Sequence, residues 1–194
     1  MDMDFKALAE ARRSCRSFET SPVSEDQLTA ILDAGRWAPS PLNQQPWEFI
    51  VITDPETKTE VRKVTEEAMK LVKDKGGPEW AAKYSPAFLE EAPVLVVVVF
   101  NPAKGGLGNY FGQKYGALQA ASACVQNMLL AASEMGFGTL WFTWFEPDRL
   151  QAVLNVPENL EIAGVVPIGL PKDPMKAPPR KDPKIHRERY QKAD

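Results

Sequence analysis

The amino-acid sequence predicts an α+β fold in which helices cover a sheet of four clear strands. Three observations lead to this prediction. Residues 94–100 are all apolar, which is the length and composition of a fully buried strand. Residues 112–135 carry apolar side chains in i, i+3, i+4 order, as a long buried helix does. Shorter stretches at 47–53, 140–144 and 162–168 are rich in β-branched or aromatic residues and supply the other strands.

Helix boundaries are marked by capping residues and prolines. Asp4 can cap a first helix, which we expect to end near Arg16. Ser24 stands three residues before a glutamine, which is the form of a capping box, and it starts a second helix that Pro39 stops. Asp54, followed by a proline, opens a third helix.

Residues 73–93, here called the lid segment, break the regular pattern. They combine glycines and prolines with three aromatic side chains expected to be exposed, Trp80, Tyr84 and Phe88. We expect a mobile segment with short helices that faces the substrate. The alternative is that these aromatics form a satellite core beneath a structural loop.

Residues 171–194, here called the tail, contain five prolines between positions 171 and 183 and should be extended. Because the tail also carries Met175, Ile185 and Tyr190, we expect it to pack on another surface, for which a partner subunit is a good candidate. It is also a candidate for a fifth strand. The length of 194 residues favours one domain of ordinary size, so residues 1–194 are expected to form a single domain, and no internal repeat is visible.

Composition excludes several classes of function. The chain is 44% hydrophobic and 25% charged with a formal net charge of −3, so nothing points to nucleic acid or to a membrane surface. Two cysteines and one histidine favour neither a disulfide framework nor a metal site. The histidine, His186, lies in the charged tail, which disfavours hydrolysis by a histidine-dependent nucleophile. The N-terminus lacks a secretory signal, so a cytoplasmic protein is expected.

Three segments carry side chains that could bind a ligand. The arginine motif comprises Arg12, Arg13, Ser14 and Arg16, and on a helix Arg12 and Arg16 would share one face. Arginine forks and a hydroxyl suit a phosphate monoester, although arginines near a helix C-terminus can also simply complement its dipole. The third segment is the part of the tail around Arg180, which follows a Gly-Leu-Pro turn. Taken alone, this segment is typical of a solvated basic stretch.

The second segment is the proline–amide loop, residues 38–47. Its prolines restrict the backbone, while Ser40, Asn43 and two glutamines offer donors and acceptors suited to the edge of a heteroaromatic ring. The alternative is an ordinary helix-to-strand turn in which Trp47 anchors the core.

Together these segments resemble the nitroreductase family of flavoproteins. The arginine motif followed by Phe18 is similar to that family's phosphate-binding motif, and the proline–amide loop matches its second signature nearly residue for residue. Residues 126–138 look like the central dimer helix and the turn beyond it, and residues 167–171 resemble the closing landmark. The matches run from about residue 11 to residue 180.

The resemblance implies an α+β homodimer, with a mostly antiparallel sheet and a C-terminal extension exchanged between subunits. It implies FMN in two interface pockets and NAD(P)H as electron donor, with ping-pong hydride transfer and no metal. By the resemblance, the arginine motif and Arg180 would hold the phosphate and ribityl chain of FMN. Pro39, Ser40 and Asn43 of the other subunit would lie beside the ring. Backbone groups of Leu140 and Trp141 would also lie near the ring.

The acceptor stays open at this point. Members resembling this chain reduce nitroaromatics, quinones or related small molecules, whereas other subgroups dehalogenate iodotyrosine or fragment the flavin. Glu79, Lys83 and Tyr84 of the lid segment resemble the dehalogenase lid in composition but not convincingly in order. A flavin-binding protein without turnover is the alternative from another class. We assign no catalytic side chain, because the cofactor would carry the hydride; Trp80 and Tyr84 are the candidates for substrate contact.

Overall fold

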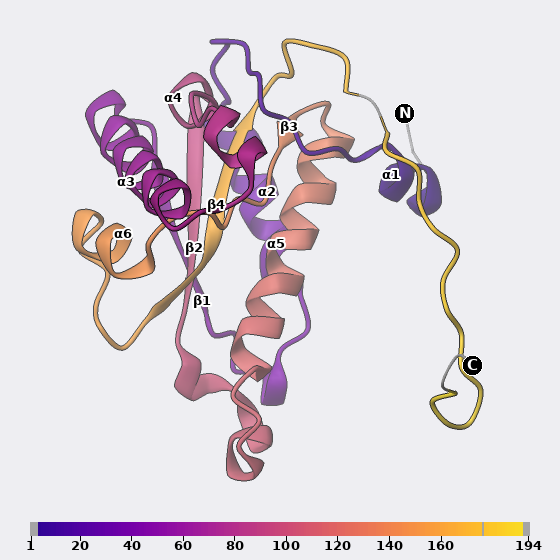
Figure 1. Cartoon of the computed structure of the whole chain (residues 1–194). Coiled ribbons are helices and arrows are strands. Elements are labelled where there is room, and N and C mark those ends of the chain that lie inside the picture. Colours follow the sequence, from indigo (N-terminus) through magenta and orange to yellow (C-terminus); the bar gives the residue numbers. More distant parts are fainter. Residues whose placement is uncertain (1–3, 176, 192–194) are drawn as a thin grey trace.

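The computed structural model describes residues 4–175 and 177–191. These residues form α-helices and short 3-10 helices around one sheet (Figure 1). In chain order the elements are α1 (Phe5–Ala11), α2 (Glu25–Arg36), η1 (Pro41–Asn43), β1 (Trp47–Ile52), α3 (Pro55–Asp74), η2 (Glu79–Lys83), α4 (Phe88–Glu91), β2 (Val94–Phe100), η3 (Pro102–Lys104), η4 (Gly106–Phe111), α5 (Gly116–Glu134), β3 (Gly138–Thr139), α6 (Pro147–Val153) and β4 (Glu161–Gly169).

The sheet has the strand order β1-β2-β4-β3, and every pairing is antiparallel. Strand β2 is central, and all seven of its residues are buried. Its side chains alternate between two cores, because successive residues of a strand point to opposite faces. Val96 and Val98 pack with α2 and α5 on one face, whereas Val97 and Val99 pack with residues of α3, α4 and α6 on the other. The predicted α+β class and antiparallel sheet are confirmed.

Several predicted boundaries agree with local chemistry. Ser24 and Gln27 form both hydrogen bonds of a capping box at the start of α2. The Asp54 side chain accepts a hydrogen bond from the Thr57 backbone N–H at 2.8 Å and caps α3. Gly136, just beyond α5, has a φ of 83°, a left-handed conformation that glycine adopts without strain.

The first helix was predicted too long. It ends at Ala11 instead of near Arg16, and the Asp4 side chain makes no capping hydrogen bond. Residues beyond it run extended beside β3, where the Cys15 backbone N–H donates to the Thr139 carbonyl at 2.8 Å. Burial of Cys15 and Phe18 in the core outweighs the weak local helix propensity of this stretch.

The third strand was also misplaced. Residues 140–144 do not form a strand; β3 covers Gly138–Thr139, and Phe142 makes only an isolated bridge to Val165. The Trp141 indole N–H donates to the Ala163 carbonyl at 3.0 Å and packs so closely on Gly164 that a Cβ there would lie 2.5 Å from the ring nitrogen. The indole N–H therefore uses the Ala163 carbonyl that a further backbone hydrogen bond between residues 140–144 and β4 would need.

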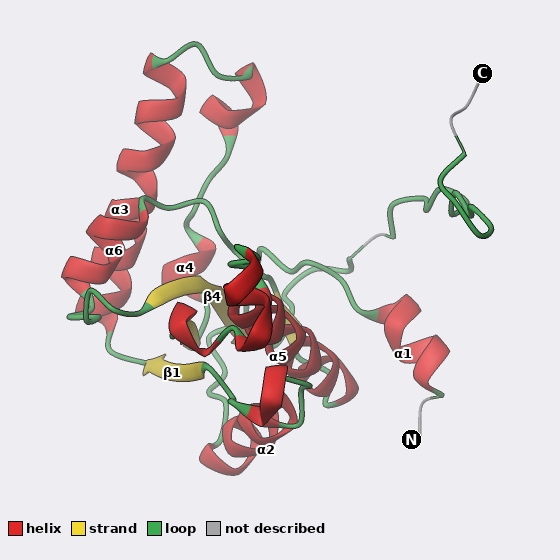
Figure 2. Ribbon diagram, turned by 90° about the horizontal axis from the view of Figure 1, so that it is seen from below, coloured by secondary structure: helices red, strands yellow, loops and turns green. Residues whose placement is uncertain are grey.

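Helix α1 and the tail project from the body in both views (Figures 1 and 2). No residue of α1 is buried, and residues 177–191 are exposed and form neither helix nor strand, as their prolines predict. In the described part of the tail no fifth strand pairs with the sheet of the same chain. Strand β1 remains an edge strand, with Val51 41% exposed.

Candidate functional site

The side chains of the arginine motif meet the tail around one hollow of about 280 Å³, here called the arginine hollow. Its lining residues are Arg12, Arg13, Ser14, Arg16, Pro178 and Arg180. Burial, followed by the positive charges of Arg180 and Arg13, lowers the pKa of the half-buried Arg12 guanidinium. Cations therefore gather here with no carboxylate among the lining residues, which is the electrostatics of an anion site.

The extended backbone explains why these side chains converge. In an extended chain alternate residues point the same way, so Arg12, Ser14 and Arg16 face one side while Cys15 is buried against Gly138. Arg13 does not follow this alternation: it lines the same hollow, and its guanidinium donates to the Arg12 carbonyl at 2.7 Å. The backbone at Ser14 pairs in parallel with Thr139 and fixes this orientation. The predicted grouping of Arg12 with Arg16 is therefore correct, but the helical face offered as its reason is wrong.

The proline–amide loop is ordered by its own polar side chains. Ser40 accepts a hydrogen bond from the Gln45 backbone N–H at 3.0 Å, and the Gln45 side chain donates to Asn43 at 3.2 Å. Leu42 and Asn43 both have positive φ, near 50°, in the left-handed region that residues other than glycine rarely adopt. Trp47 is 7% exposed and lies in the core, as expected.

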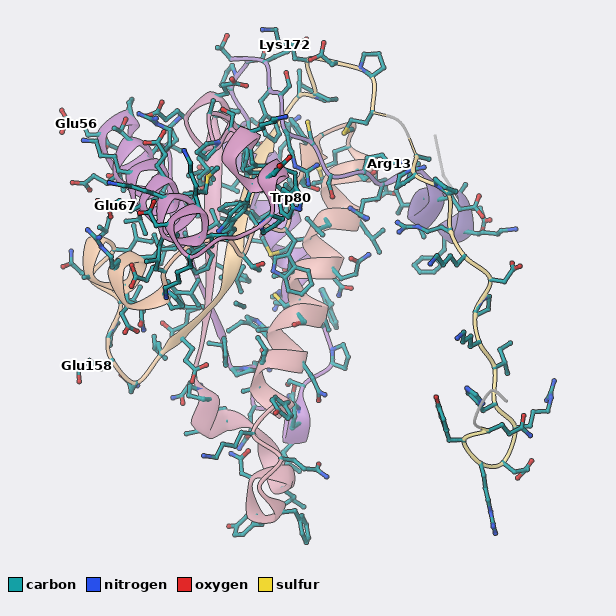
Figure 3. The ribbon with its side chains drawn as sticks, in the orientation of Figure 1. Arg13, Glu56, Glu67, Trp80, Glu158 and Lys172 are labelled. Atoms are coloured by element: carbon teal, nitrogen blue, oxygen red, sulfur yellow. The ribbon has the colours of Figure 1, made fainter. Side chains whose placement is uncertain are left out.

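This loop lies far from the arginine hollow of the same chain. Pro39 and Ser40 border a shallow depression beside Gln119 and Ala123, near the N-terminal end of α5. Arg13 lies toward the other end of that helix (Figure 3). Even from Ala123 to the C-terminal end of α5 is about 17 Å, so one chain does not bring Pro39, Ser40 and Asn43 to the arginine motif.

Leu140 and Trp141 do lie near the arginine motif, since they directly follow the Thr139 that pairs with Ser14 and Cys15. Leu140 is 5% exposed and its side chain belongs to the core. The Trp141 indole is bonded to the Ala163 carbonyl. Any contact of Leu140 with a ligand must therefore use its backbone, as the resemblance implied.

The lid segment contains two short helices, η2 and α4. Its aromatic rings pack on aromatic residues of the segment that follows β3. Trp80 is 62% exposed and meets Trp144 edge-on, with ring centroids 5.5 Å apart. Tyr84 packs on the same Trp144 at 5.5 Å. Phe88, predicted to be exposed, is 1% exposed and packs on Phe142, so for this residue the core interpretation was the correct one.

Sequence reasoning missed Trp144 and Pro178. Trp144 joins the two lid aromatics to the body, and Pro178 closes one side of the arginine hollow. The dense aromatic run at 141–145 could have drawn attention to Trp144, whereas nothing in the tail distinguishes Pro178 from its neighbouring prolines.

Comparison with known proteins agrees with this geometry. The Nitroreductase family model matches residues 9–170. The chain belongs to the nitroreductase family. A protein of Archaeoglobus fulgidus, provisionally named as an NADH dehydrogenase/NAD(P)H nitroreductase, is 32% identical over 92% of this chain and 94% of its own length. The iodotyrosine deiodinase of Thermotoga neapolitana is 28% identical over 90% of this chain and 92% of its own.

A solved structure of oxidised iodotyrosine deiodinase, bound to FMN and 3-iodo-L-tyrosine, superposes on this nitroreductase-family chain with a TM-score of 0.83. It is 25% identical and the match covers 94% of this chain and 98% of the other. The family match ends at residue 170, before the tail. The place of Arg180 in the hollow therefore depends on the geometry of this nitroreductase-family chain rather than on the match.

Other features of the described residues are less informative. They contain no group of three histidine, cysteine or acidic side chains placed to hold a metal. Within the same ranges no helix has the length and apolarity needed to cross a membrane. A larger hollow of about 520 Å³ at α6 is lined by Asp148 and Glu158 and lies outside the arginine motif.

Proposed function

We propose that this chain is an FMN-dependent oxidoreductase that uses NAD(P)H to reduce a small organic acceptor by ping-pong hydride transfer. The observation that carries the proposal is the convergence of Arg12, Arg13, Ser14 and Arg180 on one hollow, where burial and then the neighbouring positive charges lower the pKa of Arg12. The family membership of the chain and the FMN named for its structural neighbour support the same cofactor.

The donor set of the hollow fits a phosphate monoester. Its guanidinium groups present planar pairs of N–H donors, which match phosphate oxygens, and Ser14 adds a hydroxyl. A bound dianion would also relieve the repulsion between Arg12 and Arg180. Arg12, Arg13, Ser14 and Arg180 would hold the phosphate, while Arg16 would lie toward the ribityl chain.

The site would be completed by a second copy of the chain. Because Pro39, Ser40 and Asn43 lie toward the opposite end of α5 from the arginine hollow, they would contact the ring in the partner's site. Large apolar side chains exposed at this end of the chain favour such an interface, including Leu107 at 62% and Phe111 at 82% exposure. The projecting tail would exchange onto the partner and could pair with the free edge of β1.

The chain's own residues would bind the flavin, orient its ring and shield it from water. FMN supplies hydride transfer from a reduced nicotinamide to the acceptor in two successive half-reactions. The amides of the proline–amide loop would orient the ring, and backbone groups of Leu140 and Trp141 would lie beside it. The lid segment, through Trp80 and Tyr84, would exclude water and select the acceptor. No side chain is assigned as a catalytic acid or base.

A deiodinase-like activity is the second candidate. It is favoured by the relative in Thermotoga neapolitana and by the TM-score of 0.83 with the deiodinase structure. The charged lid residues offer little support, because Glu79 and Lys83 are both exposed and Tyr84 is engaged with Arg16. A flavin-fragmenting member of the family and a flavin carrier without turnover are further outcomes of the same test.

The test is a cofactor and acceptor analysis of the purified protein. The protein should be yellow and release FMN rather than FAD, since the donor set of the hollow suits one phosphate monoester. NADH or NADPH should bleach it without oxygen, and nitroaromatics or quinones should restore the colour. Restoration by 3-iodotyrosine with release of iodide would favour the second candidate. A holoprotein that no nicotinamide reduces would be a carrier, and failure to take up FMN would sink the proposal.

A further inference from the structure

The arginine motif and the lid segment touch at one point. The Arg16 Nε–H donates to the Tyr84 hydroxyl at 3.0 Å, across 68 residues of sequence. The guanidinium carbon also lies 5.9 Å from the centre of the Tyr84 ring, within the range of a cation–π interaction. These two segments were predicted to serve different purposes, one the cofactor and the other the acceptor.

Tyr84 is the better-anchored partner of this contact. Its ring packs on Trp144 at 5.5 Å and on Phe88 at 6.2 Å, and Phe88 is buried in the core. The Arg16 side chain is exposed, and its other hydrogen bond, to the Ser14 carbonyl, is a long 3.4 Å. A free arginine loses rotamer entropy when it is ordered. The hydroxyl of Tyr84 therefore orients Arg16 rather than the reverse.

The contact leaves the binding end of Arg16 available. Only Nε is used by Tyr84, so most of the terminal N–H groups of the guanidinium remain free for a ligand oxygen. Arg16 lines the arginine hollow and also contacts Tyr84. Arg16 thus stands on the side of the hollow nearest the aromatic rings of the lid segment.

We propose that Tyr84 is a positioning residue that aims Arg16 at the cofactor and couples cofactor binding to the order of the lid segment. The proposal rests on the proposed FMN site. Coupling between two sites is reciprocal, so FMN that holds Arg16 should also hold Tyr84 in place. Because Trp144 contacts both Tyr84 and Trp80, this ordering would extend to the acceptor side.

The experiment is a double-mutant cycle with two readouts. Tyr84→Phe removes only the hydroxyl, and Arg16→Lys keeps the charge but removes the Nε–H donor. FMN dissociation constants are measured by fluorescence quenching, and tryptic cleavage at Lys73, Lys75 and Lys83 is followed with and without saturating FMN. Arg149→Lys, at an exposed arginine that pairs with Glu67 outside the arginine hollow, is the control.

Tyr84→Phe should weaken FMN binding roughly tenfold, because an Arg16 that Tyr84 no longer orders must lose rotamer freedom when FMN binds, and it should abolish the protection of the lid segment by FMN. In the Arg16→Lys background the same change should weaken binding less than about twofold. Equal losses in both backgrounds would mean a merely structural role and overturn the proposal, as would wild-type affinity and protection in Tyr84→Phe. If the wild type binds FMN while Tyr84→Phe has no effect, the positioning role fails and the FMN site stands; a wild type that binds no FMN overturns both.

Discussion

Replacing Arg12 by glutamine should weaken FMN binding without weakening the folded apoprotein. Burial and the charges of Arg180 and Arg13 lower the pKa of the Arg12 guanidinium, so the folded chain disfavours this charge. A base whose pKa is lowered on folding costs stability below that pKa, and the cost is relieved only as the pH rises through it. Since arginine stays charged throughout the usable pH range, the cost is constant there until an anion offsets it.

The size of the effect follows from the contact that is lost. A hydrogen bond to a charged group is worth about 1.5–3 kcal/mol, which is roughly a tenfold to over a hundredfold change in affinity. At an FMN concentration of about 1,000 times the wild-type Kd, binding stabilises the fold by about 4.1 kcal/mol. A tenfold weaker variant keeps about 2.7 kcal/mol of this, and a hundredfold weaker one about 1.4 kcal/mol.

The assay compares FMN with riboflavin, which lacks the phosphate. Fluorescence titrations should show Arg12→Gln weakening FMN binding as above and riboflavin binding less than about twofold, with an apoprotein Tm equal to or above that of the wild type. Arg149→Gln, which breaks an exposed ion pair with Glu67, is the matched control. Equal losses for the two flavins, or a lowered apoprotein Tm, would refute the assignment of Arg12 to the phosphate.

Three further predictions follow from the same structure. Trp80→Ala should change acceptor kcat/KM several-fold while flavin content and nicotinamide oxidation are kept; losing all three would instead indicate a structural loop. Leu118→Glu, on the exposed face of α5, should give a monomer without flavin in sedimentation, and a monomer that retains flavin would contradict the shared site. Burial raises the pKa of the Cys124 thiol to about 12, so the folded protein favours the neutral thiol. The stability that depends on the neutral thiol is fully present below the ordinary thiol pKa, about 8.5, and is lost as the pH rises toward about 12. Iodoacetamide at about pH 9 should therefore label Cys124 only after unfolding, and rapid labelling of the folded protein would contradict this.

The elements that local signals specify were predicted well. Strand β2 is a run of seven apolar residues that only a fully buried position can accommodate, and it lies at the centre of the sheet. The capping box at Ser24 marks the start of α2 to the residue, since both of its hydrogen bonds lie within one turn. In these cases the deciding interactions span few residues.

The errors arose in segments whose structure is decided by contacts with residues distant in the sequence. The stretch after Ala11 lacks a local stop signal, and it is extended because β3, more than 120 residues later, offers it a backbone partner. Phe88 looked like an exposed lid aromatic because its place in the core depends on Phe142. Periodicity and composition contain no information about such pairings.

The sequence by itself determined the α+β class, the central strand, the family resemblance and the residue types that could bind a phosphate. The resemblance already implied that Arg180 joins the arginine motif, but only the tertiary structure decided that Tyr84 contacts Arg16 and that the proline–amide loop lies at the far end of α5. The physical reason is that helix and strand periodicities act over a few residues, whereas a binding site is assembled by chain crossings between segments tens to hundreds of residues apart.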